Sequence, residues 1–173
     1  MKLSIKKLKG VVAAFSLTFI GIDQLIKFIV SSNMQLDESI PLLNNVLHIT
    51  YVLNEGAAFS IMSGQTWLLC GVTSVTMAFL IWLFVSKKTE HPLAISSLGL
   101  IISGGIGNLI DRFFNGDIIF KGKVVDYIDF RLIDFAVFNF ADCCITIGTI
   151  LLVIYIFFFD AKNTAEIEES QDE

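Results

Sequence analysis

Charged residues are scarce in this chain. They make up 17% of its 173 residues, whereas 54% of the residues are hydrophobic. A soluble domain usually carries about 25% charged residues. The low charge excludes an ordinary water-soluble protein, and the mean hydropathy of +0.73 indicates an integral membrane protein. The chain is too short for more than one domain.

Cysteine is also rare, with three residues, an odd number, and no C-x-x-C pair. This counts against a membrane thiol oxidant. We expect Cys70, Cys143 and Cys144 to pack as small apolar side chains. No basic patch interleaves with aromatic residues, which excludes nucleic-acid binding.

Four apolar stretches approach the ~20 residues that a helix needs to cross a bilayer. We expect membrane helices at about 11–31, 66–85, 93–110 and 138–159, within a single domain over residues 1–162. The first stretch has no good small-residue cleavage site and is expected to be retained. Residues 163–173 are acidic and are expected to form a disordered cytoplasmic tail.

The connection over residues 32–65 contains no lysine or arginine. Within it, residues 46–53 are rich in β-branched and aromatic side chains, so a strand is expected there. Pro41 and the pair Asn44-Asn45 are interpreted as turns.

Lysine and arginine placement predicts the orientation of the helices. The termini and the 86–92 connection hold seven basic residues, and the two long connections hold four. Both termini are therefore expected in the cytoplasm, with the long connections outside. His48 and His91 then belong to opposite sides of the membrane, which excludes a haem or zinc site built from both.

Polar residues inside or beside the predicted spans all fall near the outer face. Ionisable groups within a membrane are costly and usually functional. A carrier would need them spread across the bilayer, whereas an enzyme acting at the outer surface would not. The residues are Asp23, Lys27, Asn54, Asn108, Asp111, Arg112, Asn139 and Asp142.

Structural roles are the alternative for most of these residues. An Asp23–Lys27 ion pair, four residues apart on a helix, would tie the first helix to the bundle. A salt bridge between Asp111 and Arg112 would end the third helix. Asn54 and Asn139 would satisfy backbone groups, and Asp129 and Asp134 would be solvated loop acids.

Asp142 is the hardest of these residues to explain structurally, because residues 143–159 carry no charge. Asp126 lies sixteen residues earlier, near the same membrane face, although spacing alone does not favour it over Asp129. Two neighbouring carboxyl groups share a proton and can hydrolyse a peptide without a metal or a covalent intermediate. A serine–Lys27 dyad would need Ser31, Ser32 or Ser60, none of which lies in a nucleophile motif.

Five short motifs, in order, carry a resemblance to a known family. The chain resembles lipoprotein signal peptidase (signal peptidase II), a bacterial aspartic endopeptidase of the cytoplasmic membrane. The motifs are Asp23-Gln24-x-x-Lys27, Asn54-x-Gly56-Ala57-Ala58-Phe59, Gly104-Gly105-x-Gly107-Asn108-x-x-Asp111-Arg112, Val124-Val125-Asp126-Tyr127-Ile128 and Phe138-Asn139-x-Ala141-Asp142.

The resemblance implies that Asp126 and Asp142 are the catalytic dyad. It implies that the site is lined or supported by Asn54, Asn108, Arg112 and Asn139, with Asp23, Lys27, Gly56 and Asp111 nearby. It implies a mainly α fold of four transmembrane helices with a small β-cradle on the outer membrane surface. No metal or other cofactor is expected.

The family's substrates are prolipoproteins whose cysteine already carries a diacylglyceryl group, and cleavage falls just before that cysteine. The resemblance further implies inhibition by the cyclic peptide globomycin, contact with membrane lipids, and a monomer in the bacterial inner membrane. Two departures stand out: Tyr127 replaces a common phenylalanine, and Cys143-Cys144 follows Asp142. Gly104, Gly105 and Gly107 are expected to allow close packing or to leave room for the signal peptide.

Overall fold

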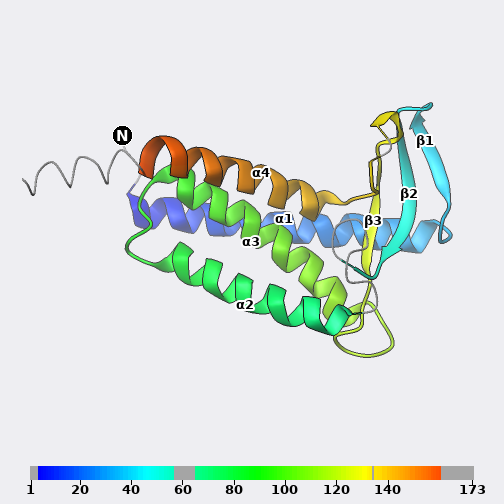
Figure 1. Cartoon of the computed structure of the whole chain (residues 1–173), viewed down its shortest axis with the longest axis horizontal. Coiled ribbons are helices and arrows are strands. Elements are labelled where there is room, and N and C mark those ends of the chain that lie inside the picture. Colours follow the sequence, from blue (N-terminus) through cyan, green and yellow to red (C-terminus); the bar gives the residue numbers. More distant parts are fainter. Residues whose placement is uncertain (1–3, 57–64, 134, 161–173) are drawn as a thin grey trace, which may run out of the picture.

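Four long helices lie side by side, with a small sheet at one end of the bundle, in the computed structural model (Figure 1). The structure describes residues 4–56, 65–133 and 135–160. Several sequence predictions lie outside these residues: those for Ala57, Ala58, Phe59, Ser60, Asp134 and the 163–173 tail.

Each of the four helices is long and apolar enough to cross a membrane. They are α1 (Ile5–Asn33), α2 (Thr66–Val85), α3 (Pro92–Phe114) and α4 (Phe140–Tyr155), the last continued by a π-helical turn, η3 (Ile156–Asp160). The prediction for α2 is confirmed. α1 and α3 run further than predicted, and α4 begins two residues later because Phe138 pairs with Ile128 in a β-bridge.

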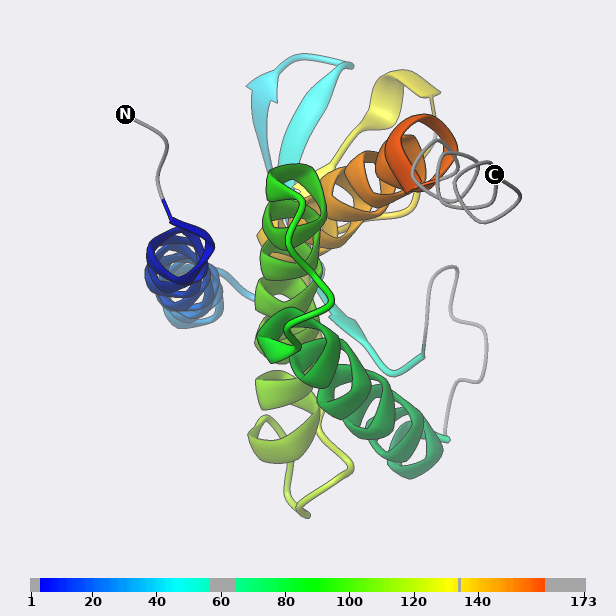
Figure 2. The same ribbon diagram turned by 90° about the vertical axis from the view of Figure 1, so that its left-hand side faces the viewer.

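α3 is the central helix and contacts each of the other three (Figure 2). In an apolar stretch of 18 residues in α3, 61% of the stretch is buried, whereas only 11% is buried in the corresponding stretch of each of the other three helices. Glycines allow this close packing. A Cβ at Gly104 would collide with the backbone carbonyl oxygen of Ala141 in α4, and one at Gly107 would lie 2.6 Å from Asp23 Oδ2. The sequence expectation of close helix approach is confirmed at these positions.

The sheet has three antiparallel strands in the order β1 (Ser39–Leu43), β2 (Leu47–Asn54) and β3 (Val124–Asp129). The predicted strand over 46–53 is confirmed as β2, and Asn45, with φ of 59°, lies in the expected turn. The prediction of a turn at Pro41 is wrong. Pro41 lies within β1, an edge strand, where a missing N–H is tolerated.

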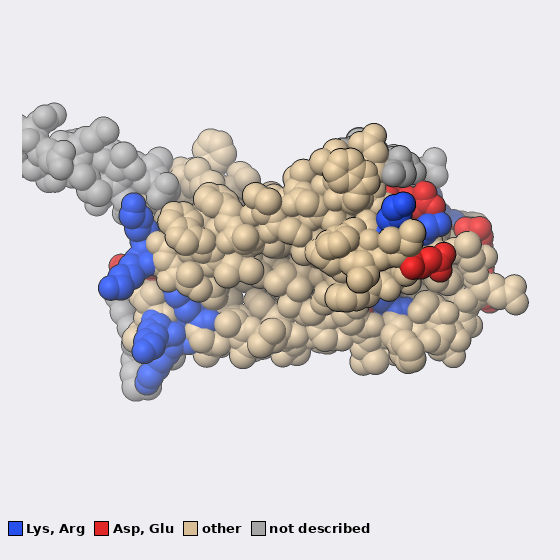
Figure 3. Space-filling model, turned by 90° about the horizontal axis from the view of Figure 1, so that it is seen from below, with Lys and Arg blue, Asp and Glu red and all other residues tan. Residues whose placement is uncertain are grey.

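The two ends of the bundle differ in charge. Basic side chains gather at the end away from the sheet, both signs meet at the sheet end, and the face between them is largely uncharged (Figure 3). At the basic end, Lys9 Nζ donates to the carbonyl oxygen of Ser86 at 2.6 Å, which ties α1 to the connection between α2 and α3. The buried charged side chains lie at the sheet end instead: Asp23, Lys27, Asp111, Asp126 and Asp129.

Candidate active site

Asp142 is held at the first turn of α4 by a capping box. The Asn139 side chain accepts from the Asp142 backbone N–H at 3.0 Å, and Asp142 Oδ2 accepts from the Asn139 backbone N–H at 3.1 Å. This reciprocal pairing satisfies two helix-end donors and fixes the carboxylate. The positive end of the helix dipole also favours a negative charge at this position.

Asp126 lies in the middle of β3 and is only 2% exposed. Its Oδ1 accepts from Asn139 Nδ2 at 2.6 Å and its Oδ2 from Asn54 Nδ2 at 2.9 Å. Burial raises the pKa of Asp126 to about 6. The Asn54 hydrogen bond opposes this rise and the charge of Asp142 adds to it. Asp126 therefore titrates near neutral pH, as a group that exchanges protons during a reaction should.

Asn139 joins the two acids. Its backbone N–H and side-chain oxygen hold Asp142, and its Nδ2 donates to Asp126. The side chain is completely buried, and Nδ2 also contacts Asn108 Oδ1 at 3.0 Å. The Phe-Asn-x-Ala-Asp motif thus places one residue between the carboxyl group on β3 and the carboxyl group on α4.

A buried ion network lies behind the two acids. Lys27 Nζ contacts Asp23 Oδ2 at 2.8 Å, Asp111 Oδ2 at 3.0 Å and Asn108 Oδ1 at 2.9 Å. The predicted Asp23–Lys27 ion pair is therefore present. The predicted pairing of Asp111 with Arg112 is wrong, because Asp111 turns toward α1 and pairs with Lys27.

The two acids of this network also bind the backbone next to the candidate catalytic residues. Asp23 Oδ1 accepts from the N–H of Ala141, which precedes Asp142, at 3.0 Å. Asp111 Oδ2 accepts from the N–H of Val125, which precedes Asp126, at 3.2 Å. The ion network thus supports both strand β3 and the start of α4.

Tyr127 adds a further link between these elements. Its Oη accepts from the backbone N–H of Phe140, the first residue of α4, at 3.2 Å. A phenylalanine would leave this helix-end donor without that partner. Burial raises the pKa of Tyr127 above its ordinary value, so the hydroxyl stays protonated. The sequence departure at Tyr127 therefore has a structural use that the motif did not reveal.

Arg112 binds the loop that follows β2. Its Nη2 donates to the carbonyl oxygen of Gly56 at 2.8 Å, and the Gly56 N–H donates to Asn54 Oδ1 at 2.9 Å. The Arg112 Nε is buried and has no hydrogen-bond partner among the residues that the structure describes. Arg112 and Gly56 thus orient Asn54, whose amide holds Asp126.

A cavity of about 670 Å³ opens in front of the two acids. Its polar part is formed by five side chains: Asp126, Asp142, Asn54, Asn108 and Arg112. The remaining walls are largely apolar. They come from strands β2 and β3 (Val52, Leu53 and Val124), from the segment before α4 (Phe135, Ala136, Val137 and Phe138) and from the first turns of α4 (Cys143, Ile145, Thr146 and Ile147). The cavity therefore suits a largely apolar ligand with one polar bond placed at the acids.

Cys143 was expected to pack as an apolar side chain, but it is only half-buried and lines this cavity. Cys70 and Cys144 are buried and free, as expected. Across the described ranges, no group of three histidine, cysteine or acidic residues could hold a metal ion.

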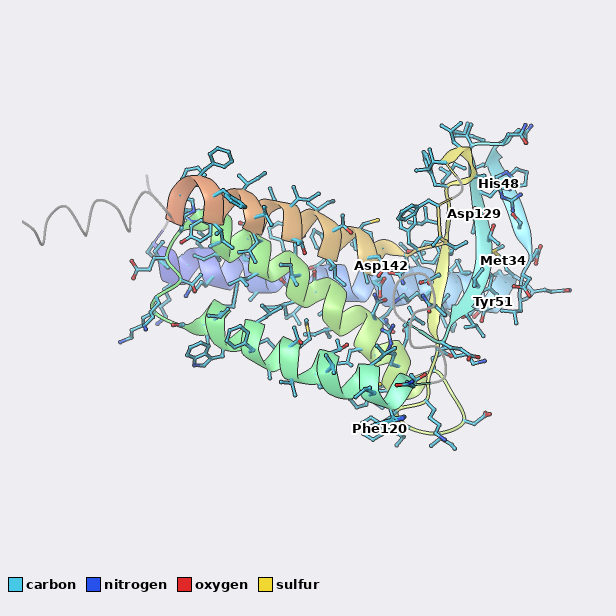
Figure 4. All side chains as sticks on the ribbon, viewed as in Figure 1. Met34, His48, Tyr51, Phe120, Asp129 and Asp142 are labelled. Carbon is cyan, nitrogen blue, oxygen red and sulfur yellow. The ribbon has the colours of Figure 1, made fainter. Side chains whose placement is uncertain are left out.

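Asp129 differs from the sequence expectation. It is buried, at 8% exposure, at the end of β3, and is not a solvated loop acid. Its Oδ2 accepts from Thr50 Oγ1 at 2.6 Å and from Arg131 Nε at 2.8 Å. Asp129 lies on β3 near His48, while Asp142 lies where α4 approaches the sheet (Figure 4). Asp129 does not line the cavity, so the geometry favours Asp126 as the partner of Asp142.

Comparison with known proteins points in one direction. A family model described as signal peptidase (SPase) II matches residues 15–158. A lipoprotein signal peptidase from Clostridioides difficile (strain 630) is 41% identical over 144 residues, covering 83% of this chain and 93% of the relative. Another from Nostoc punctiforme is 39% identical over 161 residues, covering 91% and 94%.

A solved structure described as a bacterial membrane enzyme has the same fold. It superposes with a TM-score of 0.79 at 30% identity and covers 91% of both chains. A second, described in the same words, gives a TM-score of 0.76, also at 30% identity, over 87% of this chain and 94% of the other. Every residue described around the cavity lies within the 15–158 match.

Proposed function

This chain belongs to the signal peptidase II family, and on that premise we propose that Asp126 and Asp142 are the carboxyl groups with which it cuts its substrate. The chain is an aspartic-type protease of four membrane-spanning helices that removes signal peptides from prolipoproteins. The observation that carries the proposal is the position of Asn139, which hydrogen-bonds both acids at the head of the cavity.

The reaction needs one ionised and one protonated carboxyl group. The ionised group takes a proton from water as the water oxygen bonds to the scissile carbonyl carbon, and the other group gives its proton to the carbonyl oxygen. The resulting gem-diol collapses: the first group returns its proton to the leaving nitrogen, the C–N bond breaks, and a hydroxyl proton restores the second group. Each cycle consumes one water and leaves both acids as they began.

The cavity supports a lipid-modified substrate. Its apolar walls extend from the two acids along α4 into the membrane span, where an apolar signal peptide and acyl chains would be stabilised by burial. We assign the substrate as a diacylglyceryl-modified prolipoprotein, cut just before the lipidated cysteine. The acids lie at the sheet end of the bundle, at the level where such a lipid anchor would hold that bond.

The supporting residues fall into two groups by contact. Asn54, Asn108 and Asn139 hydrogen-bond a candidate catalytic carboxyl group directly. The others act through backbone or through these amides: Asp23, Lys27, Gly56, Asp111 and Arg112.

We further propose a monomer in the bacterial inner membrane, with one domain over residues 1–162 and both termini in the cytoplasm. The basic residues at the end away from the sheet (Figure 3) support this orientation. The sheet and the acids then lie at the outer face. Globomycin should bind the cavity and raise the unfolding temperature of the protein in detergent.

Cleavage of a diacylglyceryl-modified prolipoprotein peptide in detergent tests the function. Mass spectrometry should show a single cut before the modified cysteine, and the same peptide without the lipid should be cut far more slowly. The Asp142→Asn variant keeps the capping geometry but cannot exchange the proton, so it should be inactive. Equal cleavage of both peptides, or an active Asp142→Asn variant, would refute the proposal.

A further inference from the structure

Lys27 is buried, at 3% exposure, yet it does not line the cavity. Its ammonium group contacts two carboxylates, Asp23 and Asp111, and one neutral acceptor, Asn108 Oδ1. A buried charge of this kind is retained at a desolvation cost. Lys27 can therefore affect the reaction through the groups that it contacts and through the field of its charge, which also reaches Asp126.

Asn108 passes that effect to Asp142. Its Oδ1 accepts from Lys27 Nζ at 2.9 Å and from Asn139 Nδ2 at 3.0 Å, so both donors fix this atom as the oxygen. The other end of the amide, Nδ2, donates to Asp142 Oδ1 at 2.8 Å. A cation at the oxygen of an amide polarises its N–H, which strengthens the hydrogen bond to a negative acceptor.

Asp126 has no such connection to Lys27. Both of its oxygens accept from amide nitrogens, Asn54 Nδ2 and Asn139 Nδ2. Asn139 also contacts Asn108, but it does so as a donor, from the same Nδ2 that binds Asp126. The ammonium of Lys27 therefore polarises the donor of Asp142 through one amide in head-to-tail order. On Asp126 the charge of Lys27 acts only through space, and more weakly than burial, the amides of Asn54 and Asn139 and the charge of Asp142.

We propose that Lys27 is a positioning residue. Its charge, passed through the amide of Asn108, keeps Asp142 as the ionised member of the pair. Asp142 then takes the proton from water, and Asp126 supplies the proton to the carbonyl oxygen. This assignment rests on the proposed function. The position of Asp142 at the N-terminus of α4 acts in the same direction.

Other ionisable groups also surround the pair. From α1 come Asp23 and Lys27, from α3 Asp111 and Arg112, from β3 Tyr127, and from α4 Cys143. Arg112 is the second cation, and its charge acts on both acids, on Asp142 at least as strongly as on Asp126. It therefore does not favour Asp126 as the ionised member.

The test is the pH dependence of kcat/KM for the diacylglyceryl peptide. Its acid limb reports the ionisation that the base requires, as a property of the coupled pair. In the Lys27→Met/Asp111→Asn variant the three-residue ion network keeps a net charge of −1 but loses its cation. We expect its acid limb to move up by about one pH unit, the size of effect that a lost neighbouring charge produces.

Two variants serve as references. Lys27→Arg keeps the charge and should keep the wild-type limb. Lys123→Met removes a lysine from a half-exposed pair with Glu55 at the same end of the bundle, and should not move the limb. Asn108→Leu leaves both salt bridges of Lys27 but removes the amide, and should reproduce the upward shift even if the double variant does not fold.

The outcomes separate a structural role from the proposed one. In either the double variant or Asn108→Leu, kcat/KM could fall by the same factor at every pH while the acid limb stays in place. Lys27 would then only support the fold, and the assignment would be wrong. An equal shift in Lys123→Met would also overturn it, since any nearby charge would then suffice. A wild-type protein that leaves the peptide uncut at every pH would instead refute the proposed function.

Discussion

Asp126 and Asp129 lie on the same strand, three residues apart, and both are buried. The side chains of an extended strand alternate, so these two point to opposite faces of the sheet. Asp126 faces the cavity and binds two amides, and its pKa is raised to about 6. Asp129 binds a hydroxyl and a guanidinium group, and its pKa is lowered.

The difference shows that the partners of a carboxyl group, and not only its small exposed surface, decide what it can do. A cation beside Asp129 stabilises its charge and makes it a poor proton donor. Amides beside Asp126 satisfy its oxygens but supply no full charge, so burial keeps its pKa high. The first arrangement stabilises the sheet, and the second suits proton exchange.

The comparison is tested most strongly by the matched pair Asp126→Asn and Asp129→Asn. Asparagine keeps the shape of either side chain but cannot exchange a proton. We expect Asp126→Asn to lower kcat by about 10³-fold or more and Asp129→Asn to retain cleavage of the diacylglyceryl peptide. An active Asp126→Asn variant, with Asp129→Asn inactive, would transfer the catalytic role to Asp129.

The donors to the two acids give the next largest contrast. Asn139→Ser keeps a good helix N-cap but cannot reach Asp126, so we expect kcat to fall by about 10²-fold, as when one preorganised donor is removed. Thr50→Val removes the hydroxyl that binds Asp129 and should leave kcat near that of the wild type. Comparable losses in the two variants would show that both acids affect catalysis through the same structure.

The packing of α3 against α4 should have a smaller effect, on stability and on cleavage by Asp126 and Asp142, and not on Asp129. A methyl group at Gly104 would meet the carbonyl oxygen of Ala141, next to Asp142, whereas one at Gly71 in α2 meets nothing. Gly104→Ala should therefore cost about 1–3 kcal/mol of stability and slow cleavage, and Gly104→Leu should slow it further. Gly71→Ala, the control, should unfold no earlier than the wild type, so equal melting curves for the two alanine variants would contradict this packing.

Hydrophobicity was sufficient to predict the four helices, because each apolar stretch is long and continuous. It did not predict β1 or β3, since β1 contains Pro41 and β3 carries two acids. The error at Asp129 has a different origin. Arg131 is only two residues away, but Thr50 lies on β2, and only the register of β2 on β3, which pairs His48 with Asp129, brings the Thr50 hydroxyl to Asp129.

The choice of Asp126 over Asp129 came from the family resemblance, because spacing treats the two acids alike. Half of the ion network could be predicted from the sequence, because Asp23 and Lys27 are one helical turn apart and side chains at this spacing can pair on any helix. Their link to Asp111 depends on the close packing of α1 on α3 at Gly107. Tertiary packing of this kind leaves no local pattern in the sequence.

The smallest expected effect concerns Asp129 and the pH dependence of stability. Burial tends to raise its pKa, but the Thr50 hydroxyl and Arg131 outweigh it, so the folded value lies below the ordinary 3.8. The ionised Asp129 then stabilises the fold fully above pH 3.8, and this contribution is lost as the pH falls through the folded value. Asp129→Asn should therefore melt about 2–4 °C below the wild type at pH 7 and pH 5, and the gap should narrow at pH 3. A gap that stays constant down to pH 3 would mean that the charge of Asp129 contributes nothing, and that its partners would hold a neutral side chain equally well.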